Sequence, residues 1–315
     1  MKNNVSKWLE IAEGFSVEIQ KAVLVAIEAG MVINTFVGTA NMKAGDGHRS
    51  VITKNDECGQ TLIMDQLKKT FPQALFLGEE DSGDTNILSK HQPVGLSAKG
   101  VRFIIDPIDG TTLYAARLGN WSVVIGVMVD GELVGSVIFA PTNNSGLLVV
   151  AEKGNGLFAI EDGYVEKLPV LSPVSPNASV VLLGVDTLLY STITQIIPTI
   201  AANVRGMYVS GSGALGLAQV AIGRAQAIIQ TPQKAWDWAG AYRLVIEAGG
   251  TFAFFKLNAG NLIWTNEISF SAFCYASENR LGFIAGEPSF VERLKKLLPV
   301  IGWSRLNPDI VSGNW

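Results

Sequence analysis

The chain has 315 residues, of which 48% are hydrophobic and 17% are charged, and its formal net charge is −4. This composition supplies enough apolar residues for a large core, carries too little charge for a disordered chain, and argues against a basic nucleic-acid-binding surface. The mean hydropathy is +0.29, but no segment has the roughly 20 consecutive apolar residues of a membrane-spanning helix. The first residues lack the apolar core of a signal peptide, and the cysteines form no CxxC pair. We therefore expect a cytoplasmic protein that binds neither membranes nor nucleic acid.

The first half of the chain is predicted to form two helices followed by a mainly antiparallel sheet. Apolar residues recur at three- and four-residue spacing over residues 16–36, and a second helix over residues 56–70 ends before Pro72. Asp130-Gly131 joins two apolar runs and is a strong hairpin signal. Strands are predicted over residues 74–77, 101–105, 121–129, 132–140, 147–152 and 156–160.

In the second half, predicted strands alternate with helices, which favours an α/β layered arrangement. Strands are expected over residues 179–184, 205–209, 225–229, 251–255, 262–265 and 283–286. Helices are expected over residues 187–197, 212–222, 237–248 and 290–298. The two halves meet at a proline-rich stretch that contains Pro169, Pro173 and Pro176. We therefore expect an N-terminal α+β half over residues 1–168 and a C-terminal α/β half over residues 169–315.

The most informative motif is DPIDGTT, which runs from Asp106 to Thr112 and directly follows an apolar strand. A residue before proline disfavours helical geometry, so we expect a sharp turn at the strand end that lets the two aspartates converge. Clustered carboxylate and carbonyl oxygens are the ligands that Mg²⁺ prefers. The glycine and threonines that follow offer N–H groups and hydroxyls, which suit a phosphate if a short helix begins there. Alternatively, the motif is an ordinary surface turn, in which Asp, Pro and Gly are common.

Two further acidic motifs lie elsewhere in the chain. GEE at residues 78–80 also follows an apolar strand, so its acids are expected at a strand end; the alternative is a solvated acidic loop. WDWAG at residues 236–240 places an acid between two tryptophans at the start of a predicted helix. That acid could simply cap the helix, but the flanking tryptophans indicate burial, and a buried acid needs a partner.

Along the chain the three motifs follow in the order GEE, DPIDGTT and WDWAG. In that order they resemble the inositol monophosphatase family, the lithium-sensitive, Mg-dependent phosphatases that also include bacterial and archaeal fructose-bisphosphatases. An ITKND element at residues 52–56 is similar to the family's VTxxD, and GSGA at residues 211–214 stands where the family has GSxA. The resemblance covers residues 16–290. It implies the layered αβαβα sandwich of the sugar phosphatases, in the α+β and α/β class.

The resemblance also implies roles for individual residues. The metal site would consist of Glu79, Asp106, the backbone carbonyl of Ile108, Asp109 and Asp237. Among the catalytic residues, Glu79 and Thr111 would hold and orient the attacking water, and Asp56 would help to position a water-rich outer metal site. The phosphate would bind to Gly110, Thr111 and Thr112. The rest of the substrate would contact Gly211, Ser212, Gly213, Ala214, Gln230 and Asp237. Two to three Mg²⁺ ions per site are implied, with Mn²⁺ as an alternative metal and Li⁺ as an inhibitor, and so is a homodimer.

Two departures from the family pattern concern the substrate. The family usually has a glutamate that contacts a sugar hydroxyl seven residues before the aspartate of WDxAG, and this chain has Gln230 there. The family usually reads TTNF after DPIDG, whereas here Thr112 is followed by Leu113 and Tyr114. Both differences spare the metal motifs and leave the identity of the substrate open.

The resemblance therefore implies Mg-dependent hydrolysis of a phosphate monoester of a small polyol or sugar. The closest alternative is a fructose-1,6-bisphosphatase-like or broad sugar phosphatase. A phosphoadenosine phosphate phosphatase and a non-catalytic regulatory protein on the same fold rank lower, the latter because every metal-ligand position of the family motif is present.

Overall fold

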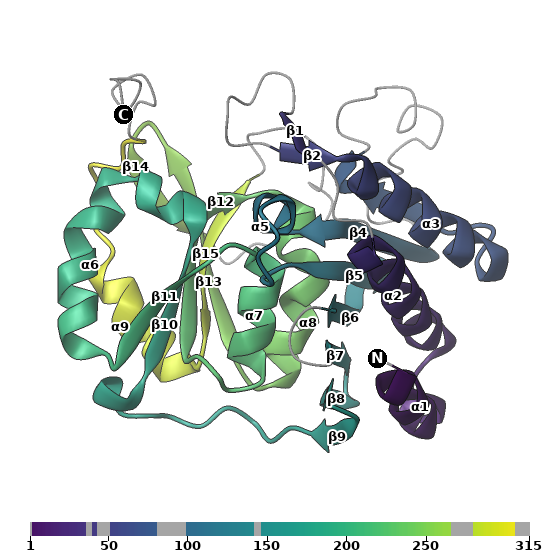
Figure 1. The fold of residues 1–315 in the computed structure, drawn as a ribbon. Helices are drawn as coiled ribbons and strands as arrows, with labels where there is room; N and C mark the ends of the chain where they lie inside the picture. The colour runs from purple at the N-terminus through teal and green to yellow at the C-terminus, as the bar shows by residue number, and fades with distance from the viewer. Residues whose placement is uncertain are drawn as a thin grey trace.

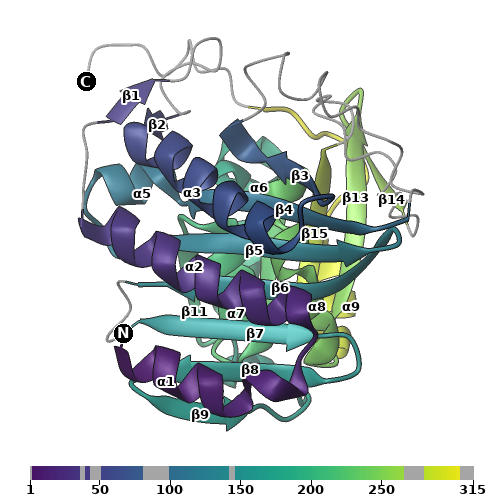
Figure 2. The same cartoon turned by 90° about the vertical axis from the view of Figure 1, so that its right-hand side faces the viewer.

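The computed structural model describes residues 2–35, 40–42, 51–80, 99–141, 146–265 and 280–305. Two large sheets and three layers of helices alternate in it (Figures 1 and 2), and β1 (Ala40–Met42) and β2 (Val51–Thr53) form a separate two-stranded sheet. Helices α1 (Lys2–Ile11), α2 (Val17–Thr35) and α3 (Lys54–Thr70) cover the outer face of the first sheet. Helices α7 (Gly213–Ala221) and α8 (Ala239–Glu247) lie between the sheets, and α6 (Ser191–Asn203) and α9 (Pro288–Leu297) cover the second sheet. This is the layered αβαβα sandwich predicted from the sequence.

The first sheet has seven strands in chain order. They are β3 (Leu75–Gly78), β4 (Val101–Asp109), β5 (Ser122–Val129), β6 (Glu132–Ala140), β7 (Leu147–Glu152), β8 (Gly156–Glu161) and β9 (Tyr164–Lys167). Strands β3 and β4 pair parallel and all other neighbours in this sheet pair antiparallel, so the predicted mainly antiparallel sheet is confirmed. The predicted hairpin turn is confirmed: Asp130 and Gly131 have φ values of 51° and 85°, and positive φ at both positions is what a type I′ turn requires.

The second sheet has six strands in the order β11-β10-β12-β15-β13-β14. Their bounds are β10 (Val180–Gly184), β11 (Gly206–Ser210), β12 (Ala227–Gln233), β13 (Thr251–Asn258), β14 (Asn261–Thr265) and β15 (Leu281–Gly286). Strands β11, β10 and β12 run parallel, and the remaining pairs are antiparallel. None of the helices in the described ranges is long and apolar enough to cross a membrane.

Two helices differ from the sequence-based predictions. Helix α1 was not predicted, because its ten residues are mostly polar; it is held by Trp8, which is completely buried. The helix expected over residues 187–197 is instead a 3₁₀ turn at Val185–Leu189 followed by α6, which continues past Pro198. Ile193 and Ile200 are buried on either side of that proline, so packing against the sheet outweighs the hydrogen bond that proline cannot donate.

The central helix layer approaches the first sheet most closely at two glycines, Gly126 on β5 and Gly240 on α8. A Cβ atom added to Gly126 would lie 3.0 Å from the Cα atom of Gly240. A Cβ atom added to Gly240 would lie 2.2 Å from Val124 Cγ1. These backbones are close because neither residue has a side chain, and the contact sets the distance between α8 and the sheet.

We therefore expect Gly240→Val to lower the free energy of unfolding by about 1–3 kcal/mol through overpacking. Urea denaturation measures the change. Gly206→Val is the matched control, because a Cβ atom at Gly206 meets no heavy atom within 4 Å. Equal destabilisation of the two variants would contradict the role of this contact.

Candidate functional site

The two aspartates of the DPIDGTT motif lie at the end of β4. The strand was predicted over residues 101–105, but it continues to Asp109. Asp106 pairs with Val124 and Asp109 pairs with Ser122, so β4 has one more residue than β5 between these pairs. Side chains three residues apart would face opposite sides of a regular strand, and the extra residue of a bulge removes that conflict. The bulge, and not a turn, therefore lets the two carboxylates interact.

A five-residue helix, α5 (Thr111–Ala115), follows directly. Gly110 precedes it with a φ of 97°, and a Cβ atom there would lie 2.8 Å from the backbone oxygen of Asn120, so the position requires glycine. Thr111 is half-buried and its Oγ1 lies 3.0 Å from the carbonyl oxygen of Ile108 and 3.1 Å from Asp56 Oδ1. Thr112 is exposed. The start of α5 thus combines a hydroxyl with the backbone N–H groups expected to bind phosphate.

Asp56 reaches Thr111 from the first turn of α3. The helix begins at Lys54, two residues earlier than predicted, because Thr53 is its N-cap. Asp56 Oδ2 accepts hydrogen bonds from the backbone N–H of Thr53 at 2.7 Å and from its hydroxyl at 2.6 Å. Asp56 is fully buried, and burial raises its pKa to about 6 although the hydrogen bonds from Thr53 act in the opposite direction. The carboxyl group therefore titrates close to neutral pH.

The GEE motif lies at the end of β3, next to β4. Gln60 of α3 packs against Gly78, and its Oε1 accepts a hydrogen bond from the backbone N–H of Glu80 at 3.1 Å. Glu79 is half-buried and interacts with Asp106. Burial, and then repulsion from Glu79 and the neighbouring aspartates, raises the pKa of Asp106 well above its usual range.

Asp109 points towards the N-terminus of α7. Its carboxylate accepts hydrogen bonds from the Ser212 hydroxyl and from the backbone N–H groups of Gly213 (3.1 Å), Ala214 (2.7 Å) and Leu215 (3.4 Å). Burial raises the pKa of Asp109 to about 6, and these donors limit the increase. The GSGA element is therefore brought to the acidic cluster, because the partial positive charge of a helix N-terminus stabilises a carboxylate.

Asp237 ends a 3₁₀ turn at Ala235–Asp237, two residues before α8. Its Oδ2 accepts a hydrogen bond from the backbone N–H of Lys234 at 2.9 Å. Burial, with repulsion from Glu79 and Asp109, raises its pKa to about 7, and the charge of Lys234 partly offsets this. Three chain segments therefore contribute to one acidic cluster, which consists of Glu79, Asp106, Asp109 and Asp237.

Gln230 is buried on β12, between two glycines that bring it close to the cluster. A Cβ atom on Gly184 would lie 1.6 Å from Gln230 Oε1, and one on Gly213 would lie 3.0 Å from Gln230 Nε2. The same Cβ atom on Gly213 would lie 3.4 Å from the backbone oxygen of Asp237. The amide therefore occupies a slot that only glycines on both sides leave open.

The acidic cluster fits a hard divalent cation in its chemistry. Its buried carboxylates repel one another, and a bound cation relieves such repulsion. The carbonyl of Ile108 lies between the two aspartates of β4 in sequence. Over the described ranges, no three Asp, Glu, His or Cys side chains stand in metal-binding geometry; Asp109 and Asp237 direct oxygens to backbone N–H groups instead. Coordination of a cation by the whole set would therefore require these side chains to rotate away from those N–H groups.

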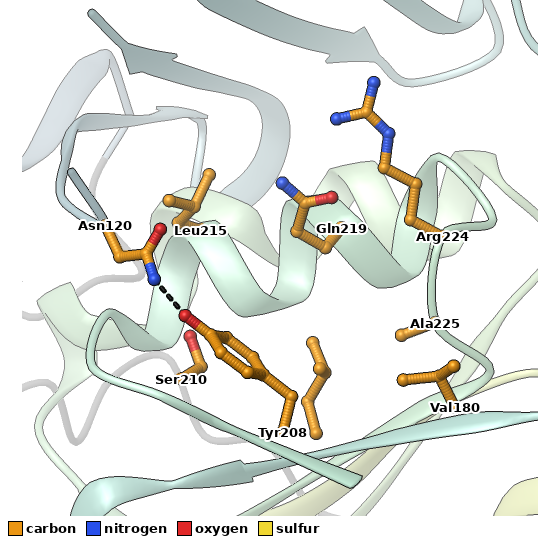
Figure 3. Close-up of a pocket in the computed structure, with 9 residues that line it drawn as sticks. Asn120, Val180, Tyr208, Ser210, Leu215, Gln219, Arg224 and Ala225 are labelled. Carbon is orange, nitrogen blue, oxygen red and sulfur yellow. Dashed lines mark hydrogen bonds between the residues drawn. The ribbon is translucent and has the colours of Figure 1, made fainter. Parts of the chain in front are cut away.

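A separate cavity of about 270 Å³ lies between α7, the edge strand β11 and its neighbour β10 (Figure 3). Asn120 donates a hydrogen bond to the Tyr208 hydroxyl across it. Leu215 lines this cavity with its side chain, while its backbone N–H points to Asp109 on the other side. None of the four acids lines the cavity, so it lies behind the acidic cluster rather than containing it.

Sequence reasoning missed three side chains that hold the site: Gln60, Asn55 and Tyr114. Asn55 Nδ2 donates a hydrogen bond to the Tyr114 hydroxyl at 2.6 Å. Asn55 lies inside the ITKND element and Tyr114 stands where the family has phenylalanine, so both were visible in the sequence. Nothing in the sequence pattern indicated that they meet.

The chain is similar in sequence and in fold to known proteins. The model of the inositol monophosphatase family matches residues 8–280. The chain is 31% identical over 230 residues to the fructose-1,6-bisphosphatase/inositol-1-monophosphatase of Thermotoga maritima, covering 72% of this chain and 80% of that protein. It is 29% identical over 255 residues to Nus factor SuhB of Salmonella typhimurium, covering 78% and 90%. The solved structure of extragenic suppressor protein suhB from Bartonella henselae is similar with a TM-score of 0.70 at 25% identity, covering 90% and 98%. The chain therefore belongs to the inositol monophosphatase family.

Proposed function

We propose that this protein hydrolyses a phosphate monoester of a small polyol or sugar with the help of two to three Mg²⁺ ions, for which Mn²⁺ can substitute. The observation that carries the proposal is the meeting of the acidic cluster with the Asp56–Thr111 pair at one end of β4 and α5. The proposed metal ligands are Glu79, Asp106, the carbonyl of Ile108, Asp109 and Asp237. Bound Mg²⁺ would supply positive charge for the phosphoryl oxygens and acidify water.

The residues around the proposed metal ligands would activate the water and bind the phosphate. Thr111 lies within hydrogen-bond distance of Asp56, so its oxygen would accept a proton from an attacking water while its own proton passes to the Asp56 carboxylate. A base is most effective when its pKa lies near the working pH, and burial brings the pKa of Asp56 to about 6. The N–H groups of Gly110, Thr111 and Thr112 would hold the phosphoryl oxygens, and Glu79 would help to orient the water.

The substrate end of the site is proposed to lie along residues 211–214 and Gln230. A glutamine can donate a hydrogen bond to a hydroxyl or accept one from it, but unlike a glutamate it carries no charge. The neutral amide therefore suits a sugar or polyol hydroxyl and also tolerates a second anionic group nearby. This favours the alternative of a fructose-1,6-bisphosphatase-like or broad sugar phosphatase, which agrees with the double name of the Thermotoga maritima relative.

The Salmonella typhimurium relative, named Nus factor SuhB, supports a second candidate, a regulatory protein on the same fold. The two candidates differ in a single assay, because only the enzyme releases phosphate. A homodimer is proposed in either case.

The first test is a phosphate-release screen with Mg²⁺ or Mn²⁺ over inositol-1-phosphate, fructose-1,6-bisphosphate, other sugar phosphates and a phosphoadenosine phosphate.

We expect Asp237→Asn to lower turnover on the order of 100-fold or more, because it removes a proposed metal ligand. The variant should fold, since the neutral amide relieves repulsion in the cluster. Glu166→Gln is the control, because Glu166 is exposed on β9, and millimolar Li⁺ should inhibit the wild type. Wild-type turnover by Asp237→Asn would rule out the assigned site, and absence of turnover on every substrate would favour the regulatory candidate.

We expect Gln230→Glu to change the relative kcat/KM among sugar phosphates on the order of tenfold, because a carboxylate repels substrates that carry a second phosphate. The readout is the ratio of kcat/KM for inositol-1-phosphate to that for fructose-1,6-bisphosphate. Gln219→Glu is the matched control, because Gln219 lines the separate cavity behind the cluster. If the ratio stays constant in Gln230→Glu, Gln230 does not contact the substrate.

The raised pKa values predict how stability depends on pH. Asp56 and Asp109 have pKa values of about 6 and Asp237 of about 7, all above the ordinary aspartate value of 3.8. The folded state therefore binds more protons than the unfolded state between about pH 4 and pH 7. Without divalent metal, the free energy of unfolding should rise as the pH falls from about 8 to about 5.

Urea denaturation in a chelator measures this dependence. Mg²⁺ should flatten it by stabilising the ionised carboxylates, and the Asp109→Asn/Asp237→Asn double variant should lose most of it. Stability that increases with pH over this window in the metal-free wild type would contradict the burial of ionised acids in one cluster.

A further inference from the structure

Helix α5 is too short to hold its own position. It has five residues and begins after a left-handed glycine, and isolated helices of this length are unstable in water. Thr111 is its first residue, and of its five residues only Tyr114 is buried. The place of the Thr111 hydroxyl therefore depends on how Tyr114 is anchored.

Tyr114 is anchored by its ring and by its hydroxyl. The ring packs edge-on against Trp121, with 5.0 Å between the ring centroids. The hydroxyl donates a hydrogen bond to the carbonyl of Ile33 at 3.0 Å and accepts one from Asn55 Nδ2 at 2.6 Å. Ile33 belongs to α2 and Asn55 to α3, so a single hydroxyl connects three helices.

These bonds run beside the pair proposed to handle the water. Asn55 directly precedes Asp56 on α3, and Tyr114 follows Thr111 by one turn of α5. Two connections therefore join the start of α3 to α5: Asn55 to Tyr114 at 2.6 Å, and Asp56 to Thr111 at 3.1 Å. Both hydrogen bonds join α3 to α5. Loss of the Asn55–Tyr114 bond therefore allows the Asp56–Thr111 distance to lengthen.

The position of α5 also decides where the Thr111 proton goes. A threonine hydroxyl has one proton to donate, and two acceptors lie at nearly equal distances, Ile108 O at 3.0 Å and Asp56 Oδ1 at 3.1 Å. Ile108 belongs to β4 and Asp56 to α3, so a shift of α5 relative to α3 favours one acceptor over the other.

We propose that Tyr114, through its hydrogen bonds to Asn55 and Ile33, is a positioning residue that keeps the Thr111 hydroxyl on Asp56. The proposal rests on the proposed phosphatase function for its kinetic consequence. A phenylalanine, the residue that the family motif has at this place, would keep the contact with Trp121 and lose both hydrogen bonds. The Asn55–Tyr114 pair thus distinguishes this chain from that motif.

The test is Tyr114→Phe, with Tyr190→Phe as the matched control at a half-buried tyrosine on the far side of the second sheet. We expect kcat to fall about five- to tenfold while KM for the phosphate ester changes less than about twofold, because Thr111 and Asp56 act on the water. Asn55→Ala should reproduce the loss, and the double variant should lose little more than either single variant, since both disrupt one connection. Thermal melting shows whether Tyr114→Phe remains folded.

The decisive comparison is made in an Asp56→Asn background. There Tyr114→Phe should cause no further loss of kcat, because the carboxylate to which it directs the Thr111 hydroxyl is already removed. A full additional loss, a change confined to KM, or an unchanged kcat in Tyr114→Phe would overturn the proposal.

Hydrogen exchange separates this inference from the proposed function. The backbone N–H groups of Leu113 and Tyr114 donate to the carbonyl of Gly110, and they should exchange several-fold faster in Tyr114→Phe. Absence of turnover in the wild type would contradict the proposed function alone. Unchanged exchange at these amides would overturn the positioning role of Tyr114 whether or not the protein is an enzyme.

Discussion

Repulsion between buried carboxylates is the constraint on which the rest of this structure depends. Asp106 and Asp109 are almost inaccessible to solvent, and each has a raised pKa caused first by burial. Folding must therefore bring together groups that disfavour each other's charge. Backbone N–H groups at the start of α7 and at Lys234 offset part of this cost. The remaining cost is the repulsion that the proposed cation would relieve.

The layered fold makes that cluster possible because its acids come from different layers. Asp106 and Asp109 belong to the first sheet, whereas Asp237 precedes α8 in the central helix layer. The cluster exists only when that layer packs on the sheet, which it does at the contact between Gly126 and Gly240. The acidic cluster and the close packing of the two layers therefore depend on each other, because Gly240 of the WDWAG motif makes the close contact with the sheet.

Local signals in the sequence predicted the parts of the fold that depend on local chemistry. The Asp130-Gly131 turn and the order of the acidic motifs follow from residue type and spacing alone. The β4 bulge could not be predicted, because it arises from pairing with β5, a partner that the motif itself does not specify. Helix α6 continues through Pro198 for the same reason: its stability comes from burial against a sheet, which local propensity does not report. The Asn55–Tyr114 bond joins residues 59 positions apart, and a single sequence contains no record of that contact.

The distribution of charge in the proposed site determines the order in which a cation and a phosphate ester would bind. An anionic phosphate cannot approach four carboxylates without strong repulsion unless positive charge arrives first. The positive charge of Lys234 does not balance these carboxylates, because it only partly offsets the raised pKa of Asp237. Beyond the cluster, the substrate end offers the neutral amide of Gln230, and the water-handling end offers the hydroxyl of Thr111. In the proposed reaction, cation binding would therefore have to precede phosphate binding, and the uncharged groups at both ends would then orient the substrate without changing that charge balance.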